Sequence, residues 1–274
     1  MAPSSTLQSF ELGLPSWCDA GVKGILGLSR LERRYLEVKR ELSADADCTQ
    51  FCIAALSMLG VSVVFDAERI ALLKKLRAPM LFVANHPFGG VEALALMALM
   101  GQVRADYRFV GNAILTEIPE IAPALLPVNI VSSLSGSALM PNHMALLAAL
   151  RHLRAGGVLG MFPAGEVAEL RSWRARRATE RAWHPHLATL ARKSGAFVVP
   201  VYFEGQSSAL FRYAGLIAPR MRLALLAREM LRPPSIIAPK IGSPIEAHLC
   251  PELSPTEFSA WLQARCFALA IGSA

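Results

Sequence analysis

Long apolar runs are missing from this sequence. No stretch of about 18 consecutive apolar residues occurs, and a helix needs about that length to cross a bilayer. The stretch from Met1 to Thr6 also lacks the basic region followed by an apolar region that marks a signal peptide. We therefore expect neither a membrane-spanning segment nor a secretion signal.

Cysteine pairs of the C-x-x-C type are absent as well. The number of cysteines is odd, and without a secretion signal this favours reduced thiols in a cytosolic compartment over a disulfide framework. They are Cys18, Cys48, Cys52, Cys250 and Cys266. No metal site is expected, because His184 and His186 would share one face of an extended segment but no further ligand spacing supports them.

Three common catalytic or nucleotide-binding patterns do not occur. A serine hydrolase of the α/β type would carry G-x-S-x-G, and Ser207-Ser208 after an apolar run is only a weak substitute. A nucleotide-binding enzyme would carry G-x-G-x-x-G or G-x-x-x-x-G-K-S/T. The absence of these patterns argues against both classes of enzyme.

Apolar and basic residues are what the sequence has in excess. Hydrophobic residues make up 53% of the 274 positions, and 28 Lys and Arg against 21 Asp and Glu give a net charge of +7. An apolar chain without a membrane-spanning segment suggests a protein that lies on a membrane surface or binds an apolar ligand. A tightly packed α/β core could also account for the high apolar content. The positive charge favours anionic partners. The arginine clusters are not interleaved with aromatic platforms, so a membrane surface or a phosphorylated substrate fits better than nucleic acid.

Strand-like and helix-like patterns alternate along the chain. This predicts a single α/β domain with a mostly buried mixed sheet flanked by helices. Strands are expected at 61–65, 80–84, 107–110, 158–162, 197–203 and 235–241. Helices are expected at 17–42, 51–59, 70–76, 142–154 and 186–194, and after the capping box at 254–257. Loops are expected at 118–128, which contains three prolines, and at the serine-rich stretch 129–141. Residues 1–58 would form an N-terminal helical segment that packs on the domain or on a membrane, and residues 59–274 would form the α/β domain.

The segment around His86 is the strongest candidate for a functional site. An apolar strand ends in Asn85-His86-Pro87, two glycines follow, and an apolar helical pattern begins; ligands often bind at such junctions in open α/β sheets. Glu92 would lie in the first turn of that helix, where backbone N–H groups favour an ionised carboxylate. Gly89 and Gly90 would let the backbone fold back so that the imidazole and the carboxylate meet. The plainer interpretation is a buried histidine at a strand end and a glutamate in a helix first turn.

Two further motifs follow in order, and with them the sequence resembles the glycerolipid (lysophospholipid) acyltransferase superfamily. The likeness runs from about residue 59 to residue 245 and is strongest to the bacterial branch called hemolysin-like or ornithine-lipid acyltransferases. The superfamily places an Asp five residues after its histidine, whereas the acid here is Glu92, at the longer spacing that this branch shares. The motifs are Asn85-His86-Pro87-Phe88-Gly89-Gly90-Val91-Glu92, Phe162-Pro163-Ala164-Gly165-Glu166 and Val198-Val199-Pro200-Val201-Tyr202-Phe203-Glu204-Gly205.

The resemblance implies roles for individual residues. His86 would be the general base, and Glu92 would take the place of its acidic partner. Gly165 and Glu166 would help to bind the acceptor, and Pro200 would shape the donor or acceptor pocket. The full set of expected substrate-binding residues is Asn85, Gly89, Gly90, Asn112, Phe162, Pro163, Gly165, Glu166, Arg171 and Pro200.

Acyl transfer also requires donors for the developing oxyanion, and the backbone N–H groups from Gly89 to Val91 are candidates for that role. The basic run from Arg171 to Arg177 would meet the phosphates of coenzyme A, the acidic surface of an acyl carrier protein or lipid headgroups. It could equally be a solvated basic face.

The activity that the resemblance implies is direct transfer of a fatty acyl group from acyl-coenzyme A or acyl carrier protein to the hydroxyl or amine of a lyso-lipid. No bound cofactor or metal is expected. The expected place of work is an anionic membrane surface on the cytoplasmic side of a bacterial cell membrane. Two alternatives stay open: a lipid-binding, non-catalytic member of the same fold, and an α/β hydrolase of acyl esters.

Overall fold

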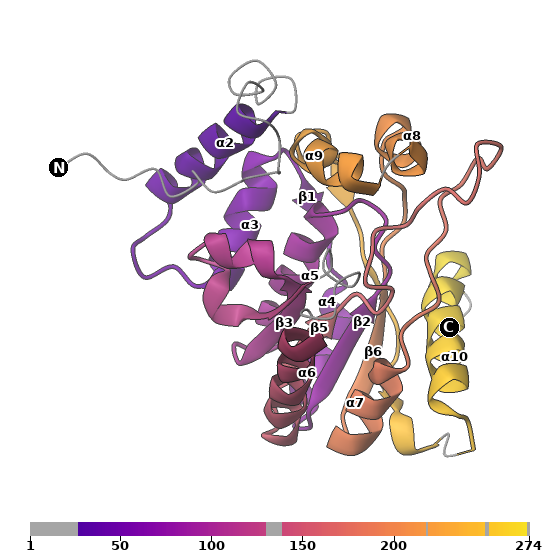
Figure 1. Ribbon diagram of the computed structural model, residues 1–274. Helices are drawn as coiled ribbons and strands as arrows, with labels where there is room; N and C mark the ends of the chain where they lie inside the picture. The colour runs from indigo at the N-terminus through magenta and orange to yellow at the C-terminus, as the bar shows by residue number, and fades with distance from the viewer. Residues whose placement is uncertain (1–26, 130–138, 218, 250–251, 273–274) are drawn as a thin grey trace.

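A computed structural model describes residues 27–129, 139–217, 219–249 and 252–272 (Figure 1). Within these residues the core is a mixed sheet of seven strands, ordered β4-β3-β5-β2-β6-β8, with β9 also pairing with β6. The five strands from β4 to β6 run parallel, and β8 and β9 are antiparallel to β6. The predicted α/β fold is thereby confirmed. The strands are β2 (Met80–Ala84), β3 (Tyr107–Asn112), β4 (Leu125–Val128), β5 (Val158–Met161), β6 (Phe197–Tyr202), β8 (Lys240–Ile241) and β9 (Ile245–Glu246).

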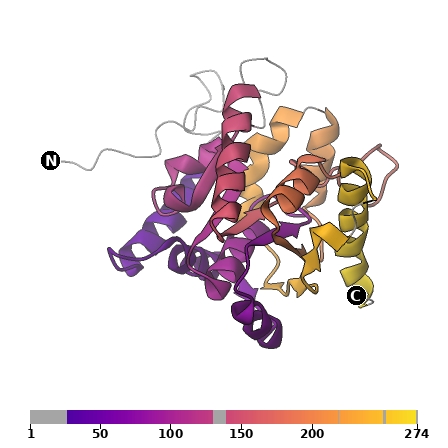
Figure 2. The same ribbon diagram turned by 90° about the horizontal axis from the view of Figure 1, so that it is seen from below.

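Helices cover both faces of this sheet, as the view from below shows (Figure 2). Strand β2 is buried on both sides because its side chains alternate between two hydrophobic cores. Phe82 and Ala84 face the core that includes α3 (Cys48–Met58), α4 (Ala67–Lys75) and α5 (Val91–Val103). Leu81 and Val83 face the core that includes α6 (Leu139–Arg154), α7 (His186–Ser194) and α10 (Pro255–Ala268). A strand in this position reads as a continuous apolar run, which is why the sequence located it to the residue.

The N-terminal part of the described chain packs on the sheet domain. Helix α3 contributes Phe51, Cys52 and Leu56 to the same core as α5. Helix α2 (Leu28–Glu41) lies outside α3 and also contacts α9 (Pro219–Met230). Its buried residue is Val38. The first part of the helix expected at 17–42 lies outside the described residues.

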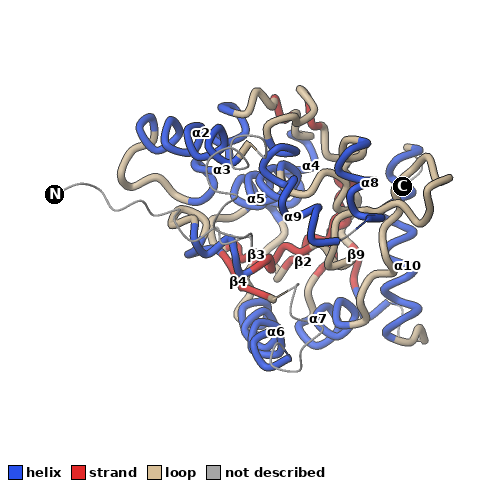
Figure 3. The backbone as a smooth tube through the Cα atoms, turned by 45° about the horizontal axis from the view of Figure 1, so that its top comes forward, coloured by secondary structure: helices blue, strands red, loops and turns tan. Residues whose placement is uncertain are grey.

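Helices α8 (Ala209–Ile217) and α9 pack against each other above the carboxyl ends of β2 and β6 (Figures 1 and 3). Short 3₁₀ turns complete the described chain: η2 (Ala113–Glu117), η3 (Ala122–Ala124), η6 (Ala247–Leu249) and η7 (Leu269–Ile271). In the part of the chain that the structure describes, no helix combines the length and the apolar content needed to cross a membrane.

Three expectations about secondary structure are wrong in detail. Part of the loop expected at 118–128 is the strand β4, and Pro127 is tolerated there because β4 lies at the edge of the sheet. The strand expected at 61–65 is reduced to β1 (Ser62–Val63), which pairs with β7 (Ile236–Ile237) in a separate two-stranded sheet. The strand expected at 235–241 therefore splits between two sheets, and Pro239, which has no N–H to donate, stands between its halves.

The end of the serine-rich stretch also differs from expectation. Helix α6 already begins at Leu139, before the expected start at 142. Residues 130–138 of that stretch lie outside the described residues, so the expected loop stays a prediction there.

Candidate active site

His86 and Glu92 meet at the carboxyl edge of the sheet. His86 Nδ1 lies 2.8 Å from Glu92 Oε1; the histidine side chain is 15% exposed and the carboxylate is fully buried. The same Oε1 accepts hydrogen bonds from the backbone N–H groups of Phe88 (2.6 Å) and Gly89 (2.8 Å), and Oε2 accepts one from the N–H of Gly90 (2.9 Å). The spacing of six residues thus brings the two side chains into contact.

The surroundings of Glu92 favour its ionised form. Burial acts to raise its pKa, but the charge of His86 and the hydrogen bonds from His86 and the backbone outweigh burial and hold the pKa of Glu92 below its usual range. A carboxylate only accepts hydrogen bonds, so the network assigns the imidazole hydrogen to Nδ1 of His86. Nε2 is then the nitrogen with a lone pair available to take a proton.

The turn between His86 and Glu92 serves the carboxylate. The N–H groups of Gly89 and Gly90 were expected to be oxyanion donors. They donate hydrogen bonds to the Glu92 carboxylate instead, so they are not free to bind an oxyanion. Gly89 has φ +101°, a conformation that favours glycine. A Cβ added there would lie 3.3 Å from Leu226 and 3.6 Å from Phe211, which shows how closely α8 and α9 cover the turn.

Two residues from the segment after β5 hold His86 in place. The ring of Phe162 stacks on the imidazole with centroids 4.1 Å apart and planes within 2°. The backbone N–H of His86 donates to Oε1 of Glu180, and Oε2 of Glu180 accepts from the indole N–H of Trp183 at 2.9 Å. Burial raises the pKa of Glu180.

Glu180 was not identified from the sequence as a partner of His86. The signal for it was weak but present, because Glu180 is the sole acidic residue in the basic stretch 170–183 and stands three positions before Trp183.

A strand–turn–helix junction with a paired histidine and acid fits an acyltransferase, and the comparison with known proteins agrees. The profile of a family described as Acyltransferase matches residues 45–260. The chain belongs to this acyltransferase family. The resemblance to lipid acyltransferases is thereby confirmed, whereas the hemolysin-like branch stays a prediction.

This chain is similar to lyso-glycine lipid O-acyltransferase from Phocaeicola vulgatus. The two sequences are 29% identical over 159 residues, which cover 55% of this chain and 53% of that protein. The chain therefore matches about half the length of this relative.

Three further residues expected to bind substrate belong to a hairpin beside His86. Gly165 makes the turn after β5, with φ +73° and its N–H donated to the carbonyl of Phe162 at 3.0 Å. Glu166 forms an ion pair with Arg181 (3.2 Å). The guanidinium of Arg171 donates to the Thr179 hydroxyl (3.2 Å) and to the carbonyl of Glu180 (3.0 Å). Arg171 thus closes the hairpin that carries Glu180.

The side chain of Asn85 joins two strand ends. Its Nδ2 donates to the carbonyl of Phe203 at 2.8 Å, and its Oδ1 accepts from the N–H of Phe203 at 2.7 Å. Asn85 is buried. It fixes the end of β2 against the end of β6, and so positions His86 rather than facing a ligand with its amide.

Three other expected binding residues take structural positions. Asn112 ends β3, two strands away from β2, and its Oδ1 accepts from the N–H of Ile114 at 3.2 Å. The carbonyl of Pro163 accepts from the N–H of His184 at 3.0 Å. Pro200 lies inside β6, where its ring would contact a Cβ added at Gly242 at 2.8 Å. The expected residues that the structure brings together are thus His86, Gly89, Gly90, Glu92 and Phe162.

Another pair noted in the sequence, His184 and His186, lies with ring centroids 4.2 Å apart. Within the described ranges, no group of three or more His, Cys, Asp and Glu side chains is arranged to hold a metal ion.

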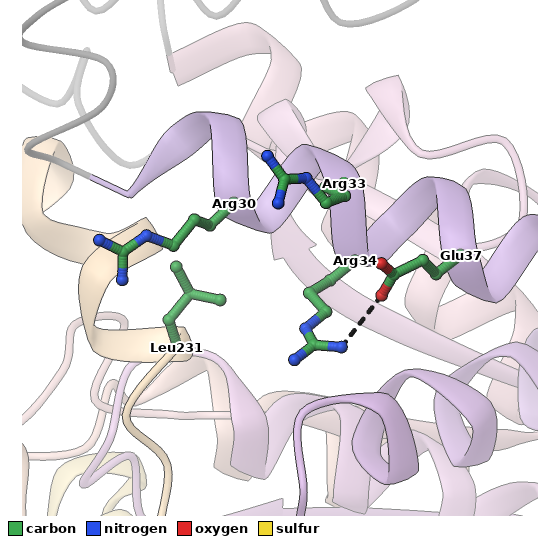
Figure 4. Close-up of a pocket in the computed structure, with 5 residues that line it drawn as sticks. All are labelled: Arg30, Arg33, Arg34, Glu37 and Leu231. Carbon is green, nitrogen blue, oxygen red and sulfur yellow. Dashed lines mark hydrogen bonds and ion pairs between the residues drawn. The ribbon is translucent and has the colours of Figure 1, made fainter.

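A basic pocket lies between α2 and the residue that follows the end of α9 (Figure 4). It has a volume of about 310 Å³ and is lined by Arg30, Arg33, Arg34, Glu37 and Leu231. Arg34 Nη1 bonds Glu37 Oε2 at 3.0 Å. Helix α9 connects the pocket to the site, because Met230, next to Leu231 in sequence, lies 3.0 Å from a Cβ added at Gly90.

Proposed function

We propose that this protein transfers a fatty acyl group from a thioester donor to a hydroxyl or amine of a lyso-lipid, by direct transfer. The observation that carries the proposal is the contact of 2.8 Å between His86 Nδ1 and the fully buried carboxylate of Glu92, which leaves Nε2 to accept a proton. Membership of an acyltransferase family supports the reaction class.

The proposed reaction begins when Nε2 of His86 takes the proton of the acceptor as its oxygen or nitrogen attacks the thioester carbonyl. The imidazolium formed lies against the Glu92 carboxylate, which stabilises it. The tetrahedral intermediate then collapses, the carbon–sulfur bond breaks, and the thiolate leaves and recovers the proton from His86. The products are an ester or amide and a free thiol, and the enzyme returns to its starting state without a covalent intermediate.

The acceptor to test first is a lyso-lipid with an amino-acid headgroup. The similar protein from Phocaeicola vulgatus is named for O-acylation of a lyso-glycine lipid, and the resemblance of this sequence to ornithine-lipid acyltransferases points to the same class. We propose a hydroxyl as the acylated group and the cytoplasmic side of a bacterial membrane as the place of reaction.

The donor proposed is acyl-coenzyme A or acyl carrier protein, each of which carries phosphate next to its pantetheine arm. The pocket of Arg30, Arg33 and Arg34 supports this, because guanidinium groups bind phosphate with paired, charge-assisted hydrogen bonds. Arg171 is a weaker candidate for phosphate, since its guanidinium is engaged in the hairpin.

A serine hydrolase has less support from the same geometry. Among the described residues, the hydrogen bonds of His86 go to Glu92, Glu180 and Ala168. The hydroxyl of Ser207 is buried and bonds none of the residues that the structure describes, and that of Ser208 bonds Glu229 at 2.6 Å. Neither serine is paired with the proposed base.

The decisive experiment measures acyl transfer from radiolabelled acyl-coenzyme A and acyl carrier protein into a panel of lyso-lipids. Wild type, His86→Ala and, as a matched control, the exposed His143→Ala are compared. We expect His86→Ala to lower turnover by about 10²–10⁴-fold, the usual contribution of a general base, and His143→Ala to act as wild type. Equal activity in wild type and His86→Ala would overturn the mechanism. Acyl-chain binding without product from any donor would favour the lipid-binding alternative.

A further inference from the structure

Helix α8 exposes a stripe of apolar side chains. Leu210, Tyr213 and Ile217 are 49%, 36% and 65% exposed. Residues spaced by three and seven positions share one face of a helix, so the three form a continuous row. Phe211 and Ala214 of the same helix are buried and face the protein.

A tryptophan from a distant segment extends this row. Trp173 is 61% exposed, and its ring stacks on Tyr213 with centroids 5.8 Å apart and planes within 16°. It belongs to the hairpin loop closed by the pairing of Glu169 with Thr179. Trp and Tyr are the side chains that concentrate at the boundary between lipid and water, because each has an apolar ring and a polar group.

The same loop carries positive charge. Arg174, Arg176 and Arg177 follow Trp173 and are exposed, and residues 170–179 contain no acid. Arginines beside exposed apolar and aromatic side chains match the surface of a bilayer with anionic lipids, where each cation near the surface adds attraction and the apolar groups enter the headgroup region.

The position of α8 connects this surface to the catalytic turn. Phe211, on the inner side of the helix, lies 3.6 Å from a Cβ added at Gly89. The exposed stripe is therefore on the outside of the helix that covers the turn between His86 and Glu92. One helix diameter, about 10 Å, separates the outer surface from the turn.

We propose that Trp173, Leu210, Tyr213 and Ile217, with Arg174, Arg176 and Arg177, form a docking surface for anionic bilayers, here called the α8 surface. The proposal rests on the proposed function, because a lyso-lipid acceptor and its acylated product both reside in a bilayer. Docking through α8 brings the bilayer to the helix that covers the active site, so that a lipid reaches His86 without crossing water.

The test is co-sedimentation of the full chain with phosphatidylcholine vesicles, with and without phosphatidylglycerol, in the absence of acyl donor and acceptor. The test variant is Trp173→Ser with Ile217→Ser. The control is Leu72→Ser with Ile236→Ser, which removes two apolar side chains of similar exposure (56% and 63%) from α4 and β7. A third variant, Arg174→Gln with Arg176→Gln and Arg177→Gln, removes charge and leaves the apolar row intact.

We expect wild type and control to bind vesicles that contain phosphatidylglycerol, and the Trp173/Ile217 variant to bind at least about tenfold more weakly. The arginine variant should lose the preference for anionic vesicles and the dependence on salt. Thermal melts check that each variant folds, and the arginine variant carries the test if the apolar variant does not.

Three results would overturn the proposal: no vesicle binding by wild type, equal binding by the test and control variants, or a loss of affinity for acyl carrier protein with vesicle binding unchanged. The last result would make the surface a protein-binding one. Turnover on a lyso-lipid dispersed below its aggregation concentration separates this proposal from the catalytic one, because the Trp173/Ile217 variant should retain that activity while His86→Ala should not.

Discussion

The backbone N–H of His86 donates a hydrogen bond to the carboxylate of Glu180, 94 positions further along the chain. The second oxygen of that carboxylate accepts from the indole N–H of Trp183. Both neighbours are donors, so the position requires a side chain with two accepting oxygens. Glu180 therefore fixes the turn after β2 against the hairpin after β5, and it positions the backbone of His86.

Replacing Glu180 by glutamine should disturb the site more than the change in size suggests. The amide NH₂ would face one of the two N–H donors, and an unsatisfied buried donor costs about 1–3 kcal/mol of the free energy of unfolding. We expect Glu180→Gln to lower the melting temperature and turnover, with the KM of the acceptor little changed. Glu180→Asp, which keeps two accepting oxygens, should recover part of the turnover. Glu246→Gln, at an exposed ion pair with His248, is the matched control and should do neither. Wild-type turnover in Glu180→Gln would show that the carboxylate does not position His86.

The buried carboxylates predict how stability depends on pH. The pKa of Glu92 is lowered, so the unfolded chain takes up this proton before the folded protein does. The stabilisation is full above the ordinary carboxyl range and is lost as the pH falls through the lowered pKa. Urea unfolding at stepped acidic pH should therefore show a steeper loss of stability in wild type than in Glu92→Gln. Parallel pH curves for the two proteins would contradict this.

Glu180 should contribute with the opposite sign. Burial raises its pKa, so the folded protein binds this proton more tightly than the unfolded chain does, and this contribution grows as the pH falls through the raised pKa. Replacing the Glu180 carboxyl group removes a contribution to the free energy of unfolding that stabilises the folded protein in acid. We expect Glu180→Gln to lose stability on acidification more steeply than wild type, in the same urea series. A shallower acid loss in Glu180→Gln would show that its pKa is not raised by burial.

The two glycines of the turn between His86 and Glu92 should differ in their tolerance of alanine. Gly89 has φ +101°, and an added Cβ would lie 3.3 Å from Leu226 and 3.4 Å from Val167. Gly90 has an extended φ of −171°, and its Cβ would meet Met230, a flexible side chain that can move. We expect Gly89→Ala to cost about 1–3 kcal/mol of stability and most of the activity, since relief of the strain at positive φ would displace the N–H that bonds Glu92. Gly90→Ala should cost less on both measures, and equal effects in thermal melts and assays would refute the distinction.

Ser207→Ala tests direct transfer against a covalent route. The buried hydroxyl has no hydrogen-bond partner within the described part of the chain, so its removal should leave stability unchanged or slightly raised. We expect wild-type acyl transfer, and intact-mass spectra of the wild-type protein after incubation with acyl-coenzyme A should show no acyl adduct. An adduct that disappears in Ser207→Ala would point to a serine nucleophile and a hydrolase-like mechanism.

Local patterns predicted the elements that local physics determines. The bounds of β2 agree with the prediction because burial on both faces produces a continuous apolar run. The end of α7 agrees because Gly195, in the left-handed conformation, closes the helix. The start of α10 agrees because its capping box lies within four neighbouring residues. The contact of His86 with Glu92 followed from the same short stretch.

What the sequence did not predict depends on distant pairing. The edge strand β4 forms because it pairs with β3. Strand β7 separates from β8 because β7 pairs with β1 in a second sheet. The hydrogen bond from His86 to Glu180, and the use of Asn85 to bind Phe203, arise only when segments about 100 positions apart meet. No local pattern encodes such meetings.

The stacked ring of Phe162 fixes the orientation of the His86 imidazole. A half-turn of the imidazole about its Cβ–Cγ bond, which would put the carbon Cδ2 in the place of Nδ1, would carry the ring edge-on through the space that Phe162 fills at 4.1 Å. Phe109, which is buried and meets Phe162 edge to face at 5.7 Å, leaves that ring little room to withdraw. The stacked ring therefore keeps Nδ1 of His86, rather than a ring carbon, against the Glu92 carboxylate. In the proposed mechanism, Nε2 would meet each new acceptor without a change in the orientation of the ring.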